Sequence, residues 1–135
     1  MNTDHDREER INQITEKIIG CAFSIANTLG VGFLEKVYEN ALAHELRKNG
    51  LRVDQQRPVD VYYDDHIVGV YVADLVIEDC VPVELKAAKA LDDAHRAQCI
   101  NHLRATGFQI GLLINFGTPK IEIKRIANPL APSLY

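Results

Sequence analysis

The stretch VADLVIEDCVPVELKAAKAL, residues 72–91, contains two apolar runs that are separated by a short polar break. Each run has the Val, Ile and Leu content of a β-strand, and the break has the length of a hairpin turn. Three charged residues, Asp74, Glu84 and Lys86, interrupt the apolar runs. Charged side chains are rarely buried without partners, so these three residues require a structural or a chemical explanation.

The register of this hairpin determines whether the three charged side chains meet. Side chains alternate between the two faces of a strand, so Glu84 and Lys86 share a face, roughly 7 Å apart. A two-residue loop at residues 79–80 would place Asp74 on the other face of the sheet. A three-residue loop at residues 78–80 places Asp74 opposite Glu84 and gathers the apolar side chains on the remaining face. We therefore predict the three-residue loop.

Amphipathic helices are predicted before and after this hairpin. Apolar residues recur at helical spacing from about Glu8 to Leu29, and again from about Leu34 to Lys48, where Gly50 follows as a stop signal. A further helix is predicted from about Asp92 to Ala105 and ends at Gly107.

The other segments are rich in Val, Ile and Tyr, which favours strands. The expected strands are LRVDQQ (51–56), VDVYYD (59–64), HIVGVYVADLVIE (66–78), VPVELKAA (81–88), FQIGLLINF (108–116) and KIEIKRI (120–126). The last of these alternates apolar and charged residues like an edge strand with one wet face. The order α-α-β-β-β-β-α-β-β predicts an α/β fold, in which a mixed central sheet is flanked by helices. The last helix is expected to be a right-handed crossover between parallel strands.

Composition indicates an ordinary soluble protein with one domain over residues 1–135 and loose ends at about 1–7 and 128–135. Apolar residues make up 47% and charged residues 25% of the chain. No apolar run approaches the ~20 residues of a membrane span, and the start, MNTDHDREER, is too polar for a signal peptide. The three cysteines have no CxxC spacing, so we expect a reduced, cytoplasmic protein. The net charge of −4 disfavours a broad nucleic-acid surface but leaves a local one open.

The three charged residues form a coherent set for phosphodiester hydrolysis. Two adjacent carboxylates repel each other, and a divalent cation such as Mg²⁺ or Mn²⁺ relieves that repulsion. A lysine two positions from a ligand can hold or deprotonate a metal-bound water, or stabilise charge that develops on phosphate. The alternative is a surface hairpin on which the three side chains form an ion pair on a solvated face. The pattern alone does not separate the two interpretations.

The chain resembles the PD-(D/E)XK nuclease superfamily from about Ile11 to Ile126. Asp74 is followed after nine residues by ELK, residues 84–86, on a hairpin between helices, as in the core motif of the superfamily. GFLEKVY resembles the signature of its small GxxExxY family, with Gly32, Glu35 and Tyr38 at the matching positions. HRAQCINHLRATG (95–107) and IGLLINFG (110–117) resemble the segments that follow in its members.

The resemblance implies a restriction-endonuclease-like αβββαβ core with an extra N-terminal helix. It also implies divalent-metal-dependent cleavage of nucleic acid, in which Asp74 and Glu84 are catalytic metal ligands and Lys86 is the catalytic lysine. The Leu85 carbonyl would be a third protein ligand. Glu35 would complete or support the metal site from its helix.

Gln98 and Tyr38 receive supporting roles. The resemblance places Gln98 beside the site, although a solvated helix face explains it equally well. Tyr38 lies on the apolar stripe of its helix, so we expect a core ring whose hydroxyl needs a buried partner, and Glu35 is a candidate. Two departures stand out: VAD, residues 72–74, lacks the basic residue common near the aspartate, and Pro82 removes one donor from its strand.

Three functions remain at this stage. The first is a Mg²⁺- or Mn²⁺-dependent nuclease, with DNA favoured over RNA, and with a homodimer slightly favoured because one small domain has one site. The second is a nuclease fold retained as a nucleic-acid-binding or regulatory module with little or no catalysis. The third is a protein-interaction domain, which a large exposed apolar patch would support.

Overall fold

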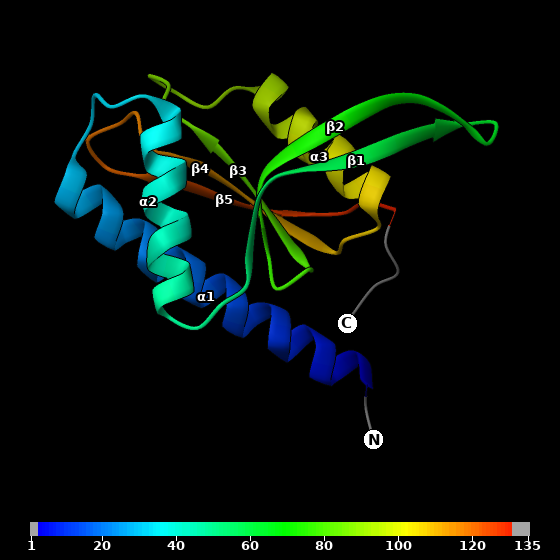
Figure 1. The fold of residues 1–135 in the computed structure, drawn as a ribbon, viewed down its shortest axis with the longest axis horizontal. Coiled ribbons are helices and arrows are strands. Elements are labelled where there is room, and N and C mark those ends of the chain that lie inside the picture. Colours follow the sequence, from blue (N-terminus) through cyan, green and yellow to red (C-terminus); the bar gives the residue numbers. More distant parts are fainter. Residues whose placement is uncertain (1–2, 131–135) are drawn as a thin grey trace.

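Five strands form one mixed sheet with two helices on one face and one helix on the other (Figure 1). This computed structural model describes residues 3–130. The elements are α1 (Thr3–Leu29), α2 (Glu35–Lys48), β1 (Val53–Tyr63), β2 (His66–Ile77), β3 (Val81–Lys86), α3 (Asp93–Thr106), β4 (Ile110–Asn115) and β5 (Glu122–Ala127). The strands lie in sequence order across the sheet, and only β3 and β4 are parallel. The predicted α/β class and the crossover through α3 are confirmed.

The sequence prediction differs most from the structure at the first helix and at residues 51–64, and the strands expected at 81–88 and 108–116 are shorter, Val81–Lys86 and Ile110–Asn115. The first helix begins at Thr3 rather than near Glu8, so residues 3–7 are helical rather than a loose end. The two strands expected at residues 51–64 are one strand, β1. Pro58 does not interrupt it because β1 is an edge strand, where a missing N–H is tolerated.

The predicted hairpin register is confirmed. Leu75 pairs with Val83 and Ile77 pairs with Val81, which leaves the three-residue loop at residues 78–80. The loop begins with two residues at positive φ, Glu78 at 51° and Asp79 at 55°. The apolar side chains of this hairpin therefore face one side of the sheet, as the alternation required.

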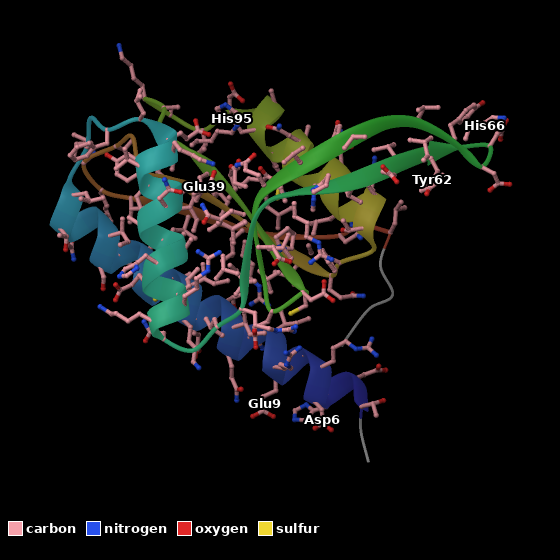
Figure 2. The ribbon with its side chains drawn as sticks, viewed as in Figure 1. Asp6, Glu9, Glu39, Tyr62, His66 and His95 are labelled. Carbon is pink, nitrogen blue, oxygen red and sulfur yellow. The ribbon has the colours of Figure 1, made fainter. Side chains whose placement is uncertain are left out.

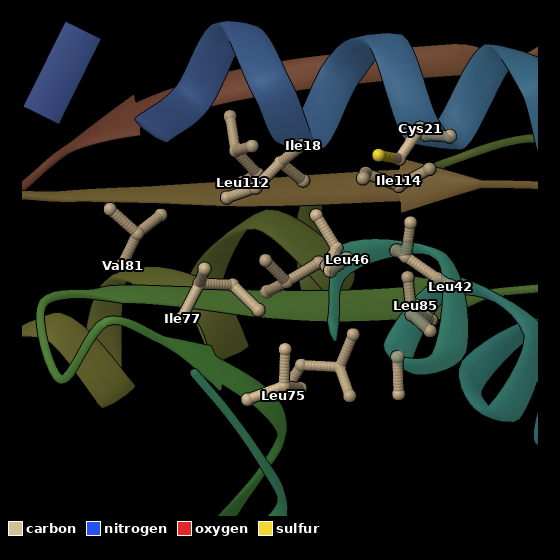
Figure 3. Packing of buried hydrophobic residues seen from close by; sticks show 14 of the residues in the cluster. Ile18, Cys21, Leu42, Leu46, Leu75, Ile77, Val81, Leu85, Leu112 and Ile114 are labelled. Atoms are coloured by element: carbon tan, nitrogen blue, oxygen red, sulfur yellow. The ribbon is translucent and has the colours of Figure 1, made fainter. Parts of the chain in front are cut away.

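The main core lies between that side of the sheet and the helices α1 and α2 (Figure 3). Five different elements each contribute a fully buried member: Ile18, Leu42, Leu75, Leu85 and Leu112. Burial of each such side chain contributes about 1.5–3 kcal/mol to folding, so this core fixes β2 and β3 against the helices. A smaller cluster, formed by Cys99, Leu103, Leu113 and Ile126, attaches α3 to the opposite face.

Both ends of α3 are fixed by local sequence. Asp92 accepts a hydrogen bond from the His95 backbone N–H, and its own N–H is paired with the His95 ring, so the two form a capping box. The helix ends at Gly107, with φ of 78°. Beyond β5, the Asn128 side-chain amide donates hydrogen bonds to the Leu103 and Phe108 carbonyls. The expected loose end at 128–135 is therefore held at Asn128, and residues 131–135 lie outside the described range.

Candidate active site

Asp74 and Glu84 lie where β2 and β3 stop pairing. Leu75 and Val83 form the pair next to them, and both belong to the core under α1 and α2. Alternation therefore places Asp74 and Glu84 together on the face that α3 covers. The Leu85 backbone N–H donates a hydrogen bond of 2.8 Å to Asp74 Oδ2, which ties the Asp74 carboxylate to β3. The two strands thus present two carboxylates on one face.

Glu84 is a buried carboxylate. It is 5% exposed, and burial raises its pKa to about 8, with a further increase from the Asp74 charge that the Lys86 charge opposes. Burial also raises the pKa of the Cys99 thiol on α3 to about 12, and the Glu84 charge adds to this, in agreement with the strand alternation. A solvated surface hairpin does not describe this residue. In residues 3–130, no ion pair within 4.0 Å joins Lys86 to either carboxylate.

The end of β3 is fastened to the end of β4, and this fixes the backbone that carries Lys86. The Phe116 N–H donates to the Lys86 carbonyl at 2.8 Å. The Asn115 side chain accepts from the Ala88 N–H and donates to the Ala88 carbonyl, each at 3.0 Å. A Cβ on Gly117 would lie 2.3 Å from the Ala88 carbonyl oxygen, so only glycine fits there. This segment, NFG, is a structural clamp beside the site.

The GFLEKVY segment at residues 32–38 is also a structural clamp. Gly32 has a φ of 107°, which favours glycine. Tyr38 is fully buried, and its ring stacks on Phe116 with centroids 4.7 Å apart. Its hydroxyl donates to the Gly30 carbonyl at 2.6 Å and accepts from the Phe33 N–H at 3.2 Å. The predicted core ring is confirmed, but Glu35 is not the partner of the hydroxyl.

Glu35 is therefore free to face the site from the first turn of α2. Partial burial raises its pKa, Lys86 lowers it, and Asp74 raises it again, so the three charges lie close enough to interact. His95 at the start of α3 also lowers the pKa of Glu35. Within residues 3–130, however, no three His, Cys, Asp or Glu side chains are grouped closely enough to hold a metal ion. Glu35 as a direct ligand remains a prediction.

The sequence analysis missed two residues that support Asp74. Glu39 on α2 is 4% exposed and faces the sheet (Figure 2). It lies three, four and seven positions before Leu42, Ala43 and Leu46, so an acidic residue on the buried stripe was the available signal. Gln56 on β1 has a φ of 53°, a strained conformation for this residue type that no sequence signal indicates.

Gln56 joins the buried glutamate to the aspartate of the site. Its Nε2 donates to Glu39 Oε1 at 2.6 Å and to Asp74 Oδ1 at 3.2 Å. Glu39 also accepts from Lys36 at 2.9 Å and from Gln55 at 2.8 Å. Buried carboxylates need such partners, so the network explains why a charged residue is tolerated on the buried face of α2.

The profile of the PD-(D/E)XK nuclease superfamily matches residues 12–126 of this chain, and these include both strands of the site. The chain belongs to the PD-(D/E)XK nuclease superfamily. A solved structure, that of the protein SSO0001, has the same fold, with a TM-score of 0.54 and 18% sequence identity. The similarity covers 71% of this chain and 51% of SSO0001, so the chain spans about half the length of that protein. No curated protein matches the chain.

The residues of this PD-(D/E)XK chain suit a divalent cation by their chemistry. Mg²⁺ takes one or two carboxylates and keeps several waters, so a third acidic side chain is not required. Asp74 and Glu84 provide two carboxylates on one face of the sheet. Burial raises the pKa of Glu84 most, and the Asp74 charge, whose repulsion a cation would relieve, raises it further. Members of the superfamily generally use divalent metals.

Gln98 is exposed on α3, and in the part of the chain that the structure describes it makes no hydrogen bond to the acidic pair. Its supporting role is therefore still a prediction.

His102, on the same helix, is 2% exposed, and its Nδ1 has no hydrogen-bond partner within residues 3–130. No helix within that range has the length and apolar character to cross a membrane.

Proposed function

We propose that this chain is a divalent-metal-dependent nuclease that hydrolyses phosphodiester bonds of nucleic acid at Asp74, Glu84 and Lys86. The observation that carries the proposal is the nearly complete burial of the Glu84 carboxylate beside Asp74, with Lys86 two positions away. Burial of one carboxylate beside a second, partly exposed one opposes folding, so such a pair indicates a functional site. Superfamily membership supports nucleic acid as the substrate.

Each of these residues has a role in the proposed reaction. Asp74 and Glu84 would hold Mg²⁺ or Mn²⁺, with the Leu85 carbonyl as a third donor. The bound cation would polarise the phosphate and lower the pKa of a water. Glu84 must release its proton before it can bind a cation, because only the carboxylate is a ligand. Lys86 would hold or deprotonate the attacking water, or stabilise negative charge on the phosphate oxygens.

Three further residues would support this centre. Glu35 would interact with the cation, directly or through a water, from the first turn of α2. Tyr38 would hold the loop before α2 in place, and thereby position Glu35. Gln98 would contact substrate or water from α3. The Gly32, Glu35 and Tyr38 pattern supports the further proposal that the chain is a member of the GxxExxY family.

The proposal also includes the kind of nucleic acid that is cleaved and the cellular location of the protein. We favour DNA over RNA as the substrate. We propose a reducing, cytoplasmic location because the three cysteines, Cys21, Cys80 and Cys99, are free thiols. One domain has one site, so cleavage of both strands of a duplex requires two copies or two successive nicks.

The deciding experiment compares nuclease activity of the wild-type protein, Lys86→Ala and Lys124→Ala. Lys124 is an exposed lysine on the edge strand β5 and is the matched control. Labelled DNA and RNA, single- and double-stranded, are incubated with Mg²⁺, Mn²⁺ or EDTA. We expect cleavage that needs the cation, is lost in Lys86→Ala and is retained in Lys124→Ala. Equal cleavage by all three proteins would assign the activity to a contaminant and remove the proposal.

A second candidate function is a nucleic-acid-binding or regulatory module without catalysis. It is favoured by the absence of a basic residue beside Asp74, where Val72 and Ala73 stand, and by the net charge of −4. Binding of labelled DNA or RNA that is independent of divalent cations, without turnover in either cation, would support this candidate instead.

A further inference from the structure

The β1–β2 hairpin extends beyond the rest of the sheet as a two-stranded arm, residues 57–73 (Figure 1). β1 and β2 pair from the Val53–Ile77 pair to the Tyr63–His66 pair, with a register shift between Val61 and Tyr62 that leaves Val68 unpaired, whereas β3 pairs with β2 only at residues 75–77. The labelled residues Tyr62 and His66 lie near the tip of the arm, away from α1 and α2 (Figure 2). From His66 to Ala73, β2 thus has β1 on one side and, within residues 3–130, no strand on the other. We call this side the free edge of β2.

The free edge is long, apolar and exposed. Residues 67–73 read IVGVYVA, without a charge or a proline. The exposed residues are Ile67 at 58%, Val68 at 61%, Val70 at 55% and Val72 at 45%. Such an edge presents unpaired backbone N–H and C=O groups, which are a template for pairing with another strand. Soluble proteins rarely leave a contiguous apolar surface of this kind without a partner.

The other edge of the arm, formed by β1, is protected against pairing. Arg57 and Asp60 place charges along it, and Pro58 removes a backbone donor. Charges and proline are the usual means by which an edge strand avoids unwanted pairing. The arm therefore blocks pairing at β1 and leaves it open at β2. This difference indicates that the free edge of β2 serves an interaction.

The charges around the free edge identify its partner. The tip of the arm carries Asp64 and Asp65, and Asp60 lies nearby, so phosphate groups would be repelled. An uncharged strand can pair with the free edge of β2 without placing like charges opposite each other. Residues 67–73 of a second copy form such a strand. Antiparallel self-pairing also brings the His66 end of one edge toward the Asp74 end of the other.

We propose that the free edge of β2 pairs antiparallel with the same edge of a second copy of this chain. The two arms would then form one continuous sheet about a twofold axis, in which each copy contributes an identical surface. The contact uses backbone pairing of residues 67–73 and needs no catalytic property of the acidic site, so it holds whether or not the chain is a nuclease. A dimer of this kind would supply two acidic sites to one substrate.

The test uses Val70→Lys, with Val31→Lys as the matched control. Val70 is 55% exposed on the free edge, and Val31 is 51% exposed in the loop before α2, so both substitutions place the same charge on a similarly exposed valine. Sedimentation equilibrium is measured from roughly 1 to 200 μM, the range in which a small interface associates. We expect wild type and Val31→Lys to associate to twice the monomer mass, and Val70→Lys to associate at least about tenfold more weakly.

Two further measurements test whether Val70 of one copy meets Val70 of the other and whether the free edge becomes protected. An equal mixture of Val70→Lys and Val70→Glu should recover the dimer, because the opposed charges then attract, whereas neither variant alone should do so. In wild type, amide hydrogen exchange of residues 67–73 should slow as concentration rises. A wild-type protein that stays monomeric throughout, or a Val70→Lys variant that dimerises as tightly as Val31→Lys, would overturn the proposal.

Discussion

Gln56 links Glu39 to Asp74, with its Nε2 at 2.6 Å from a Glu39 oxygen and at 3.2 Å from an Asp74 oxygen. The link connects the buried face of α2 to the aspartate at the divergence of β2 and β3. It depends on a positive φ at Gln56, which tertiary contacts must stabilise. A strained residue that contacts a candidate metal ligand is consistent with preorganisation of that ligand.

The first prediction concerns this link. Gln56→Ala should weaken Mn²⁺ binding by about tenfold, because residues that orient a metal ligand typically contribute 10–100-fold to affinity. Gln55→Ala is the matched control, since Gln55 donates to Glu39 at 2.8 Å but, in the described part of the chain, makes no hydrogen bond to Asp74. Isothermal titration calorimetry with Mn²⁺ measures both. Equal affinities of the two variants would show that Gln56 does not position Asp74.

The hairpin and its register were predictable from sequence because one face of it is buried. Shifting the register by one residue would move Leu75 or Val83 out of the core and Glu84 into it, so the apolar pattern permits one answer. The same pattern predicted the shared face of Asp74 and Glu84. The crossover followed from a helix placed between two apolar strands.

The supporting residues could not be predicted in the same way. The positive φ of Gln56 results from tertiary contacts, and glutamine has no local preference for it. The partner of the Tyr38 hydroxyl depends on how the loop at residues 30–33 folds back, which periodicity does not describe. The continuity of β1 through Pro58 depends on its place at the sheet edge, which only the assembled sheet reveals.

The second prediction concerns stability and pH in the absence of metal. The pKa of Glu84 is raised from 4.5 to about 8 in the folded protein, so the folded state binds more protons than the unfolded state between these values. Stability should therefore fall as pH rises from about 4.5 to about 8, by an amount on the order of a few kcal/mol. Glu84→Gln should reduce this fall. Urea denaturation in EDTA at several pH values measures it, and an identical slope in the variant would contradict the assignment.

The third prediction concerns Mn²⁺ and thermal stability. A cation that binds only the folded state raises the melting temperature, and at 100 times Kd it stabilises by about 2.7 kcal/mol. The increase should be larger at about pH 8 than at about pH 6, because Glu84 must be ionised to bind. Asp74→Ala should lose the increase. Asp60→Ala, which removes an exposed carboxylate on β1, should keep it.

The fourth prediction concerns the Tyr38 hydroxyl. Tyr38→Phe leaves the Gly30 carbonyl and the Phe33 N–H without their partner, which should destabilise the fold by about 1–3 kcal/mol. Because this bond holds the loop that precedes Glu35, the variant should also lower metal-dependent cleavage where folding is complete. Tyr62→Phe is the control, since Tyr62 is 62% exposed on the arm.

Chemical denaturation and cleavage assays at a temperature well below both melting transitions separate the two effects of Tyr38→Phe. A loss of stability with unchanged cleavage would mean that the hydroxyl stabilises the loop without positioning Glu35. Glu35→Gln then tests the carboxylate separately, and it should still lower cleavage because Glu35 would interact with the cation. A stable variant with wild-type cleavage would show that the hydrogen bonds of Tyr38 are dispensable to both fold and site.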